Sequence, residues 1–421
     1  MIFLKIRIQA EASCSKVIQE LLSPWNVTFS DSNIADVTIV YSKEKTKKPP
    51  ETKTVIIPSN TSTFRKIGTI ENTAILEADV VEAYHKALNE TFDAKSSAAY
   101  RILTGLPIHY KMAPKQLRDL LMNARVHEKG DKERLEYGEK LHFDALRFNL
   151  ASTIEEVLKE RLPRKTWNGK KYACVVTHDI DTSQGLRRAH LLKKIEERYD
   201  VPSAWYIPSD HFRLDIQTIR GLANHGEIGS HDTKHDGKLA QLSQEKLVRR
   251  LSESRQALSK AANCSIEGFR APLLQHSFKI IDALQAAGYS YDSSIPTWEP
   301  KHPSTMSPHG IGTVYPIMLK DVMELPVTLP QDHQMIHVLG MNPKETVKTW
   351  INFMSIIRET GGLCVFLIHP DYELALSKNL TVYEELLNFI KADHDAWTTL
   401  PKSIASSSPD LNISFDYCES A

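Results

Sequence analysis

The sequence predicts an α/β protein that ends in a distorted (β/α) barrel over residues 169–421. From Lys171 onward, apolar strand-like runs alternate with helical patterns, as expected of a parallel sheet covered by helices. The chain has 421 residues, which suits two domains, one of them large, at about 150 residues per domain. We therefore expect a small α/β domain over residues 1–100 and a helical connector over residues 101–168 before the barrel.

The N-terminal region shows strand and helix patterns in turn, which favours parallel pairing of its strands. The expected strands are 2–10, 36–41 and 54–58, and the expected helices are 12–23 and 77–93. No glycine-rich loop follows the first strand, so a dinucleotide site is not expected. In the connector, apolar residues recur at helical spacing over 115–126 and 133–161, and the Pro and Gly residues of 162–169 mark its end.

The barrel region continues this rhythm. Strands are expected at 172–177, 203–208, 227–230, 268–271, 322–326 and 363–369. Helices are expected at 215–225, 244–262, 278–287, 344–360 and 382–396. Such an alternation is typical of a complete or incomplete (β/α) barrel, in which functional residues gather at the C-terminal ends of the strands.

Charge and composition exclude several other classes of protein. Lys and Arg together number 52, as do Asp and Glu, so no net field draws the chain toward nucleic acid or an anionic membrane. No run approaches about 18 consecutive apolar residues, so no membrane span is expected. Lys5 and Arg7 interrupt the first apolar run, unlike a secretory signal, and the five scattered cysteines include no CxxC pair. These features together predict a cytoplasmic protein with reduced thiols.

The ends of four expected strands are unusually polar. They carry the runs Thr177-His178-Asp179-Ile180-Asp181, Ser230-His231-Asp232-Thr233-Lys234-His235, Phe269-Arg270-Ala271-Pro272 and Leu367-Ile368-His369-Pro370-Asp371. In a barrel these ends lie at one face, so the side chains are expected to meet there.

His231 and His235 have the spacing of metal ligands. Residues four apart on a helical turn face the same way, so both rings could bind one ion. Two imidazoles and one carboxylate, from Asp179 or Asp181, suit zinc or another borderline divalent metal and leave a position open for water. We expect Zn²⁺.

The ordered motifs resemble those of the polysaccharide deacetylase family, carbohydrate esterase family 4. That family has an Asp-x-Asp or Asp-Asp pair, a His-x-x-x-His, an Arg-x-Pro and a late Leu-x-His. This sequence supplies Asp179-Ile180-Asp181, His231 to His235, Arg270-Ala271-Pro272 and Leu367-Ile368-His369 in the same order. The resemblance covers about residues 170–405 and implies the barrel fold.

The resemblance also implies a role for each motif residue. Asp181, His231 and His235 would bind the metal, and Asp179 would be the general base toward the metal-bound water. His369 would be the general acid that protonates the departing amine, and Arg270 would hold Asp179 charged and oriented. These roles agree with general chemistry, because a divalent ion makes hydroxide available near pH 7 and an amide leaving group needs a proton.

Other residues near the motifs are candidates for substrate contact or for supporting the site. Pro272, Leu325 and Tyr291 are candidate substrate-binding residues, although Leu325 also suits a plain strand end. Asp292 is a candidate partner of Arg270 or His369, or a turn residue. His178 stands where the family often has an aromatic residue, and we expect it to form a wall of the site. The His333 and His337 pair is expected in a solvated or substrate-facing loop.

The predicted function is that of a metal-dependent hydrolase, which removes the acetyl group from an N-acetylated sugar or glycan. The apparent lack of an export signal favours a soluble or nascent glycan as the substrate. One alternative is a hydrolase of another small amide or cyclic imide on the same fold. The other is a non-catalytic glycan-binding protein, but the complete set of ligands, base, acid and Arg argues against it. The sequence predicts no oligomeric state.

Overall fold

The computed structural model describes residues 4–31, 34–42, 53–58, 65–70, 72–77, 79–92, 137–302 and 308–407. The described residues divide into two compact units, one within Met1–Glu90 and Leu141–Thr166 and the other within Thr91–Lys140 and Trp167–Ala421. The helix expected at 115–126, and the first residues of the one expected at 133–161, lie outside the described residues. The predicted domain boundaries stay predictions.

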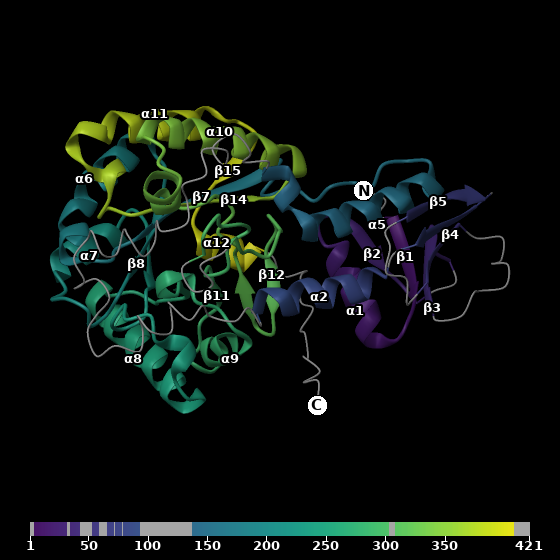
Figure 1. The fold of residues 1–421 in the computed structure, drawn as a ribbon, viewed down its shortest axis with the longest axis horizontal. Helices are drawn as coiled ribbons and strands as arrows, with labels where there is room; N and C mark the ends of the chain where they lie inside the picture. The colour runs from purple at the N-terminus through teal and green to yellow at the C-terminus, as the bar shows by residue number, and fades with distance from the viewer. Residues whose placement is uncertain are drawn as a thin grey trace. The chain divides into compact units, whose positions relative to one another are not determined.

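The first unit contains a mainly parallel six-stranded sheet in the order β2-β1-β3-β4-β6-β5 (Figure 1). Its strands are β1 (Leu4–Gln9), β2 (Val27–Phe29), β3 (Val37–Ser42), β4 (Thr54–Pro58), β5 (Arg65–Ile70) and β6 (Thr73–Glu77). Only β5 runs antiparallel, against β6. The predicted parallel pairing is therefore confirmed for β1, β3 and β4. The short strand β2 and the hairpin of β5 and β6 were not predicted.

Helices α1 (Ala12–Leu21), α2 (Val80–Phe92) and α5 (His142–Leu158) accompany this sheet. A buried charge pair joins α5 to α1, where Arg147 Nη2 lies 2.8 Å from Glu20 Oε1 and neither side chain is exposed. Asp144 Oδ1 lies 3.5 Å from Arg147 Nε. Burial raises the pKa of Glu20, and the charge of Arg147 partly offsets that rise. The helix that the sequence predicts over 133–161 thus packs as part of a compact unit.

The second unit is built on a curled parallel sheet in the order β12-β13-β11-β10-β9-β8-β7-β14, with β15 also paired to β7. Its strands are β7 (Tyr172–Asp179), β8 (Ser203–Ile207), β9 (Glu227–Ser230), β10 (Gly268–Phe269), β11 (Tyr291–Asp292), β12 (Ile317–Leu319), β13 (Val322–Glu324), β14 (Leu363–Ile368) and β15 (Ala396–Thr398). Only β12 is antiparallel to its neighbour. Two backbone hydrogen bonds connect β14 to the segments around β12 and β13, from Leu363 N–H to Val314 O and from Leu329 N–H to Val365 O. This arrangement confirms the predicted distorted (β/α) barrel.

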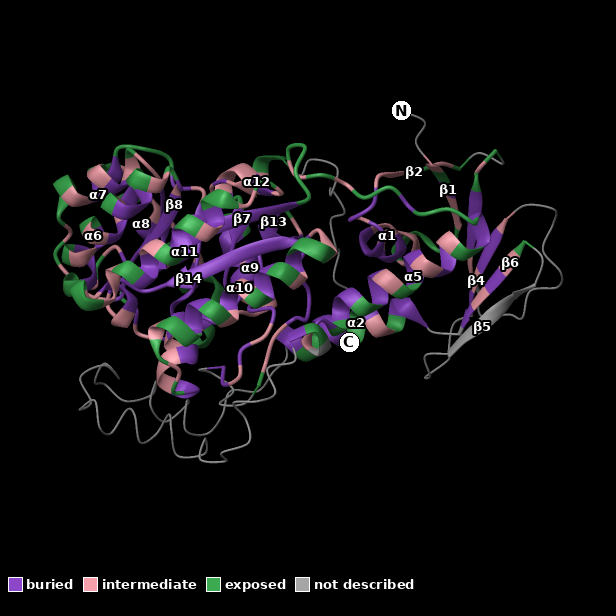
Figure 2. Cartoon of the chain, turned by 90° about the horizontal axis from the view of Figure 1, so that it is seen from above, coloured by how far each residue is buried: buried purple, intermediate pink, exposed green. Residues whose placement is uncertain are grey.

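Helices cover the outside of this sheet (Figure 1), and their inner faces and the strands are buried (Figure 2). They are α6 (Ser183–Tyr199), α7 (Ile216–Ala223), α8 (Gln244–Ala262), α9 (Phe278–Ala286), α10 (Pro343–Thr360) and α11 (Leu380–Ala392). The last helix, α12 (Pro401–Ser407), instead packs Ile404 into the apolar cluster of the barrel interior. Helix α6 was not predicted, because its sequence is dominated by Arg, Lys and Glu. No helix in the described ranges is both long and apolar enough to cross a membrane.

Two tyrosines fill the barrel interior below the site. Tyr291 donates a 2.7 Å hydrogen bond to Glu227, and its hydroxyl lies 3.1 Å from that of Tyr206. Glycines make room for both rings, because a Cβ on Gly268 would lie 1.9 Å from the Tyr291 ring and one on Gly229 would lie 2.4 Å from Tyr206. The core of the unit therefore closes the lower end of the barrel and leaves the polar strand ends at the other.

Candidate metal and catalytic site

The register of the sheet brings the polar strand ends together. Strand β14 pairs with β7 so that Ile368 lies opposite His178. His369 directly follows Ile368, and Asp179 directly follows His178, so these two residues lie at adjacent strand ends. Strand β10 pairs with β9 so that Phe269 faces Ser230, which places Arg270 and His231 at adjacent ends. The motifs, far apart in the sequence, thus share one face of the barrel, as a parallel sheet requires.

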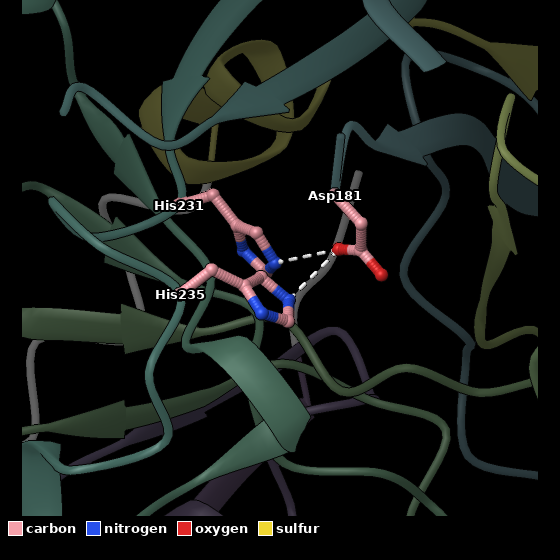
Figure 3. A group of neighbouring side chains, drawn as sticks. All are labelled: Asp181, His231 and His235. Carbon is pink, nitrogen blue, oxygen red and sulfur yellow. Dashed lines mark ion pairs between the residues drawn. The ribbon is translucent and has the colours of Figure 1, made fainter. Parts of the chain in front are cut away.

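Asp181, His231 and His235 form a group of converging ligand atoms (Figure 3). Asp181 Oδ1 lies 2.8 Å from His235 Nε2 and 3.5 Å from His231 Nε2. All three side chains are buried, and one ligand atom from each lies within 4.8 Å of the others. Among the residues that the structure describes, this is the one group of at least three such side chains that meets this condition. A carboxylate and two imidazoles match the donor set of zinc sites with an open position, so the residues fit a divalent metal.

The loop from His231 to His235 is not the helical turn that the sequence predicted. Asp232 and His235 have φ angles of +66° and +47°, so the backbone adopts the left-handed conformation at both residues. Helix α8 holds this strained loop, because Arg250 donates from Nε to Asp232 Oδ1 at 2.7 Å and Ser254 donates to the Asp232 carbonyl at 2.8 Å. The imidazoles therefore converge through side-chain anchoring of a loop rather than through helical spacing.

The backbone of Arg270 fixes the tautomer of His231. His231 Nδ1 lies 2.8 Å from the Arg270 carbonyl oxygen, which can only accept a hydrogen bond. Nδ1 must therefore carry the proton, and the lone pair of Nε2 faces Asp181 and the metal site. Such a partner behind a metal-binding histidine orients the ring and makes it a better ligand.

The side chain of Arg270 holds Asp179. Its Nη1 donates to Asp179 Oδ1 at 3.1 Å and to Thr177 Oγ1 at 2.7 Å. Its Nε donates to the Ser293 carbonyl, and its Nη2 donates to the Ser293 hydroxyl. The guanidinium also stacks over the Tyr206 ring, with Cζ 4.3 Å from its centroid. Because every contact fixes the planar fork, the carboxylate of Asp179 is held with its other oxygen, Oδ2, 3.9 Å from His231 Nε2.

His369 has a buried carboxylate partner that the sequence analysis missed. His369 Nδ1 lies 2.6 Å from Asp332 Oδ1, and the His369 backbone N–H donates to Asp332 Oδ2 at 2.9 Å. Burial acts to lower the pKa of His369, but Asp332, with help from Asp181 and Asp179, raises it to about 9. Asp332 therefore favours the protonated ring, and because it engages Nδ1, Nε2 is the nitrogen left to face the site.

Asp292 does not take the partner role that the sequence analysis considered for it. It accepts a hydrogen bond from Ser294, and its carboxyl group also interacts with that of Glu324. Glu324 Oε1 in turn accepts a hydrogen bond from the Ile295 N–H at 2.9 Å. Burial raises the pKa of Asp292 to about 7, and burial also raises that of Glu324 well above its usual value. Both carboxyl groups are therefore protonated more readily than in water, and Arg270 acts on them only through its charge.

All three predicted substrate-binding residues are buried. Tyr291 is fully buried in the barrel interior, and Leu325 belongs to the same apolar cluster. Pro272 is also buried and begins a short 3₁₀ turn. Their proposed contacts with substrate stay predictions, which the burial of Tyr291 and Leu325 does not favour.

His178 is not a wall of the site, so that prediction is wrong. Its ring points outward from β7 under α6 and α11, where Nδ1 donates to Ile368 O at 3.0 Å and Nε2 lies 2.8 Å from Glu196 Oε1. It also stacks on Trp205, with ring centroids 4.1 Å apart. Residues on one strand alternate between the two faces of a sheet, so the neighbour of Asp179 must face the helices.

His333 and His337 lie on a π-helical segment, Gln334–Val338 and its N-cap, rather than in a loop. His337 Nε2 lies 2.9 Å from Glu373 Oε2, and both histidine rings lie 5.4 Å from the Tyr372 ring by their centroids. Tyr372 in turn lies 5.0 Å from the ring of His369. This half-buried group therefore borders the acid side of the site.

The fold and the site define a (β/α)-barrel protein with an Asp-His-His group of metal-ligand type. Residues 174–291 match the family described as polysaccharide deacetylase. This match lies within the stretch of the sequence that carries the resemblance, about residues 170–405, and it confirms that resemblance. The match includes Asp179, Asp181, His231, His235 and Arg270 and ends before His369.

Solved structures also resemble this chain. Puue allantoinase is 12% identical, with 59% of this chain and 94% of that chain covered and a TM-score of 0.48. Peptidoglycan deacetylase PdaC from Bacillus subtilis is 11% identical, with 56% and 90% covered and a TM-score of 0.38. The family 4 carbohydrate esterase from Streptomyces lividans is 13% identical, with 53% and 91% covered and a TM-score of 0.36. No curated protein matches the chain in sequence.

Proposed function

We propose that this protein is a metal-dependent deacetylase that hydrolyses the acetamido group of an N-acetylated sugar or glycan. The observation that carries the proposal is what gathers at the strand ends. The Asp181, His231 and His235 group shares this face of the barrel with Asp179, held by Arg270, and with His369, held by Asp332. A base and an acid on either side of a metal site are what amide hydrolysis requires. The family match over residues 174–291 supports the same reaction class.

The three ligands would hold the ion, and zinc suits their donor set best. A divalent ion bound there would lower the pKa of water and polarise the acetyl carbonyl. Asp179 would accept the proton of the attacking water at Oδ2, because its other oxygen, Oδ1, is engaged by Arg270. His369 would donate a proton from Nε2 to the departing amine, because Nδ1 is committed to Asp332.

The same geometry argues against a non-catalytic glycan-binding role. A protein that only binds sugar has no use for a buried arginine that orients one carboxylate, or for a buried carboxylate that orients one imidazole. Each of these groups is costly to bury unless it is paired.

The direct test compares wild type with His231→Ala, in zinc content and in acetate released from N-acetylglucosamine oligomers. We expect wild type to bind one zinc ion and release acetate, and the variant to lose both. An amine product without acetate, from a small amide or cyclic imide, would instead support the alternative hydrolase. Acetate release that survives the loss of metal would overturn the proposal.

A further inference from the structure

Asp371, two residues after His369, turns back onto the loop that carries Asp181. Asp371 Oδ2 accepts a 3.1 Å hydrogen bond from the Asp181 backbone N–H. Its Oδ1 accepts a hydrogen bond from the hydroxyl of Thr182, the next residue. One carboxylate therefore holds the main chain of the metal-ligand loop from a loop at the end of a different strand.

The start of helix α6 is shaped around this carboxylate. A Cβ on Gly185 would lie 2.2 Å from Asp371 Oδ2, so any larger residue at this point of the helix would displace the carboxylate. Thr182 caps the helix by accepting hydrogen bonds from the backbone N–H groups of Gln184 and Gly185, both at 3.1 Å. Arg188, one turn later, donates to the Asp371 carbonyl at 3.2 Å.

We propose that Asp371 is a positioning residue that sets the place of the metal ligand Asp181 and couples it to the loop of the acid His369. The inference rests on the proposed metal-dependent function. A carboxylate acceptor gives strong hydrogen bonds, and it fixes the residue whose side chain must meet His231 and His235. Partners that orient a metal ligand are typically worth about 10–100-fold in metal affinity.

The test measures the zinc dissociation constant of the full chain by competition with a chromogenic chelator. We expect Asp371→Ala to weaken zinc binding by about 10–100-fold, because both acceptors are lost. Asp371→Asn should be intermediate, because its amide oxygen can keep one of the two hydrogen bonds. Gly185→Ala should also weaken binding, because the added methyl group displaces an intact carboxylate.

Thr182→Val is the matched control, because it removes the helix cap and the bond from the Thr182 hydroxyl to Asp371 but leaves the bond from Asp181 N–H to Asp371. We expect it to lower the thermal midpoint of the metal-free protein at least as much as Asp371→Ala does, with a smaller loss of zinc affinity. An unchanged dissociation constant in Asp371→Ala would overturn the inference. So would an equal loss of affinity in Thr182→Val, because the cap alone would then explain the effect.

Acetate release by the wild type, measured in the same preparations, tests the proposed function separately. A wild type that binds zinc and releases no acetate would count against the function. The change in zinc affinity among the variants would still decide the role of Asp371.

Discussion

Asp179 and Asp181 are separated by one residue but have different partners. Asp179 is held by Arg270, whereas Asp181 faces the two histidines. We expect Asp179→Asn to lower kcat by about 10²–10⁴-fold, because an amide cannot accept the proton, while zinc content stays at the wild-type level. Steady-state kinetics and metal analysis check both parts. A fully active Asp179→Asn would remove this residue from the mechanism.

Asp332 lies behind the acid and contacts it at two points. Without its charge, His369 would lose both its orientation and the largest contribution that favours its protonated form. We expect Asp332→Asn to lower kcat by about 10²–10⁴-fold with little change in zinc affinity. The alkaline limb of the kcat profile should also move to lower pH. Wild-type rates across the pH range would contradict the assigned role.

Glu299 is a buried carboxyl group whose pH dependence can be predicted. Burial, opposed by hydrogen bonds from Gln331, raises its pKa to about 8. Between the ordinary value of 4.5 and about 8, the folded state keeps a proton that the unfolded state has released. The free energy of unfolding should therefore fall by up to about 1.4 kcal/mol per pH unit as the pH rises through this window.

Glu299→Gln removes this titration and keeps an acceptor for the Gln331 N–H. We expect the variant to lose less stability than wild type between pH 5 and pH 8, as measured by urea unfolding at both values. Equal losses in the two proteins would show that Glu299 does not titrate in this window.

At the scale of elements, a glycine in a strand can leave the space that a neighbouring aromatic ring occupies. A methyl group on Gly268 of β10 would lie only 1.9 Å from Tyr291 Cζ, whereas one on Gly221 of α7 meets nothing within 4 Å. We expect Gly268→Ala to lower the free energy of unfolding by about 1–3 kcal/mol or more through overpacking. Gly221→Ala should raise it by about 0.5–1 kcal/mol through helix propensity. Thermal or urea unfolding of the two variants would test the packing, and similar effects would contradict it.

The sequence predicted the long elements of the barrel better than the short ones. Strands such as β7 and β14 are continuous apolar runs, which are recognisable without tertiary context. Helix α6 was missed because its apolar residues (Leu186, Ala189, Leu192 and Ile195) are spread among many charges. The turn expected from His231 to His235 was wrong because Arg250 and Ser254 hold that loop, and spacing alone cannot reveal such anchoring.

At the scale of the whole molecule, the site combines groups from five strand ends and their loops. The residues proposed to act directly could be predicted, because each lies in a short motif at the end of an apolar run. Their partners could not, because Asp332 and Arg250 lie in segments without a motif and reach the site only through the fold. The first unit, with its own sheet, adds no residue to the group of metal-ligand side chains described.

The most direct test of the central claim is stoichiometric measurement of acetate and free amine from an N-acetylated substrate, with chelator-treated and zinc-restored protein side by side. N-acetylglucosamine oligomers and a nucleotide-linked N-acetylhexosamine cover both polymeric and soluble sugars. We predict equal amounts of acetate and amine, formed only by the zinc-restored protein. No acetate from either substrate, with zinc bound at one ion per chain, would contradict deacetylation of N-acetylated sugars and favour hydrolysis of another amide on this fold.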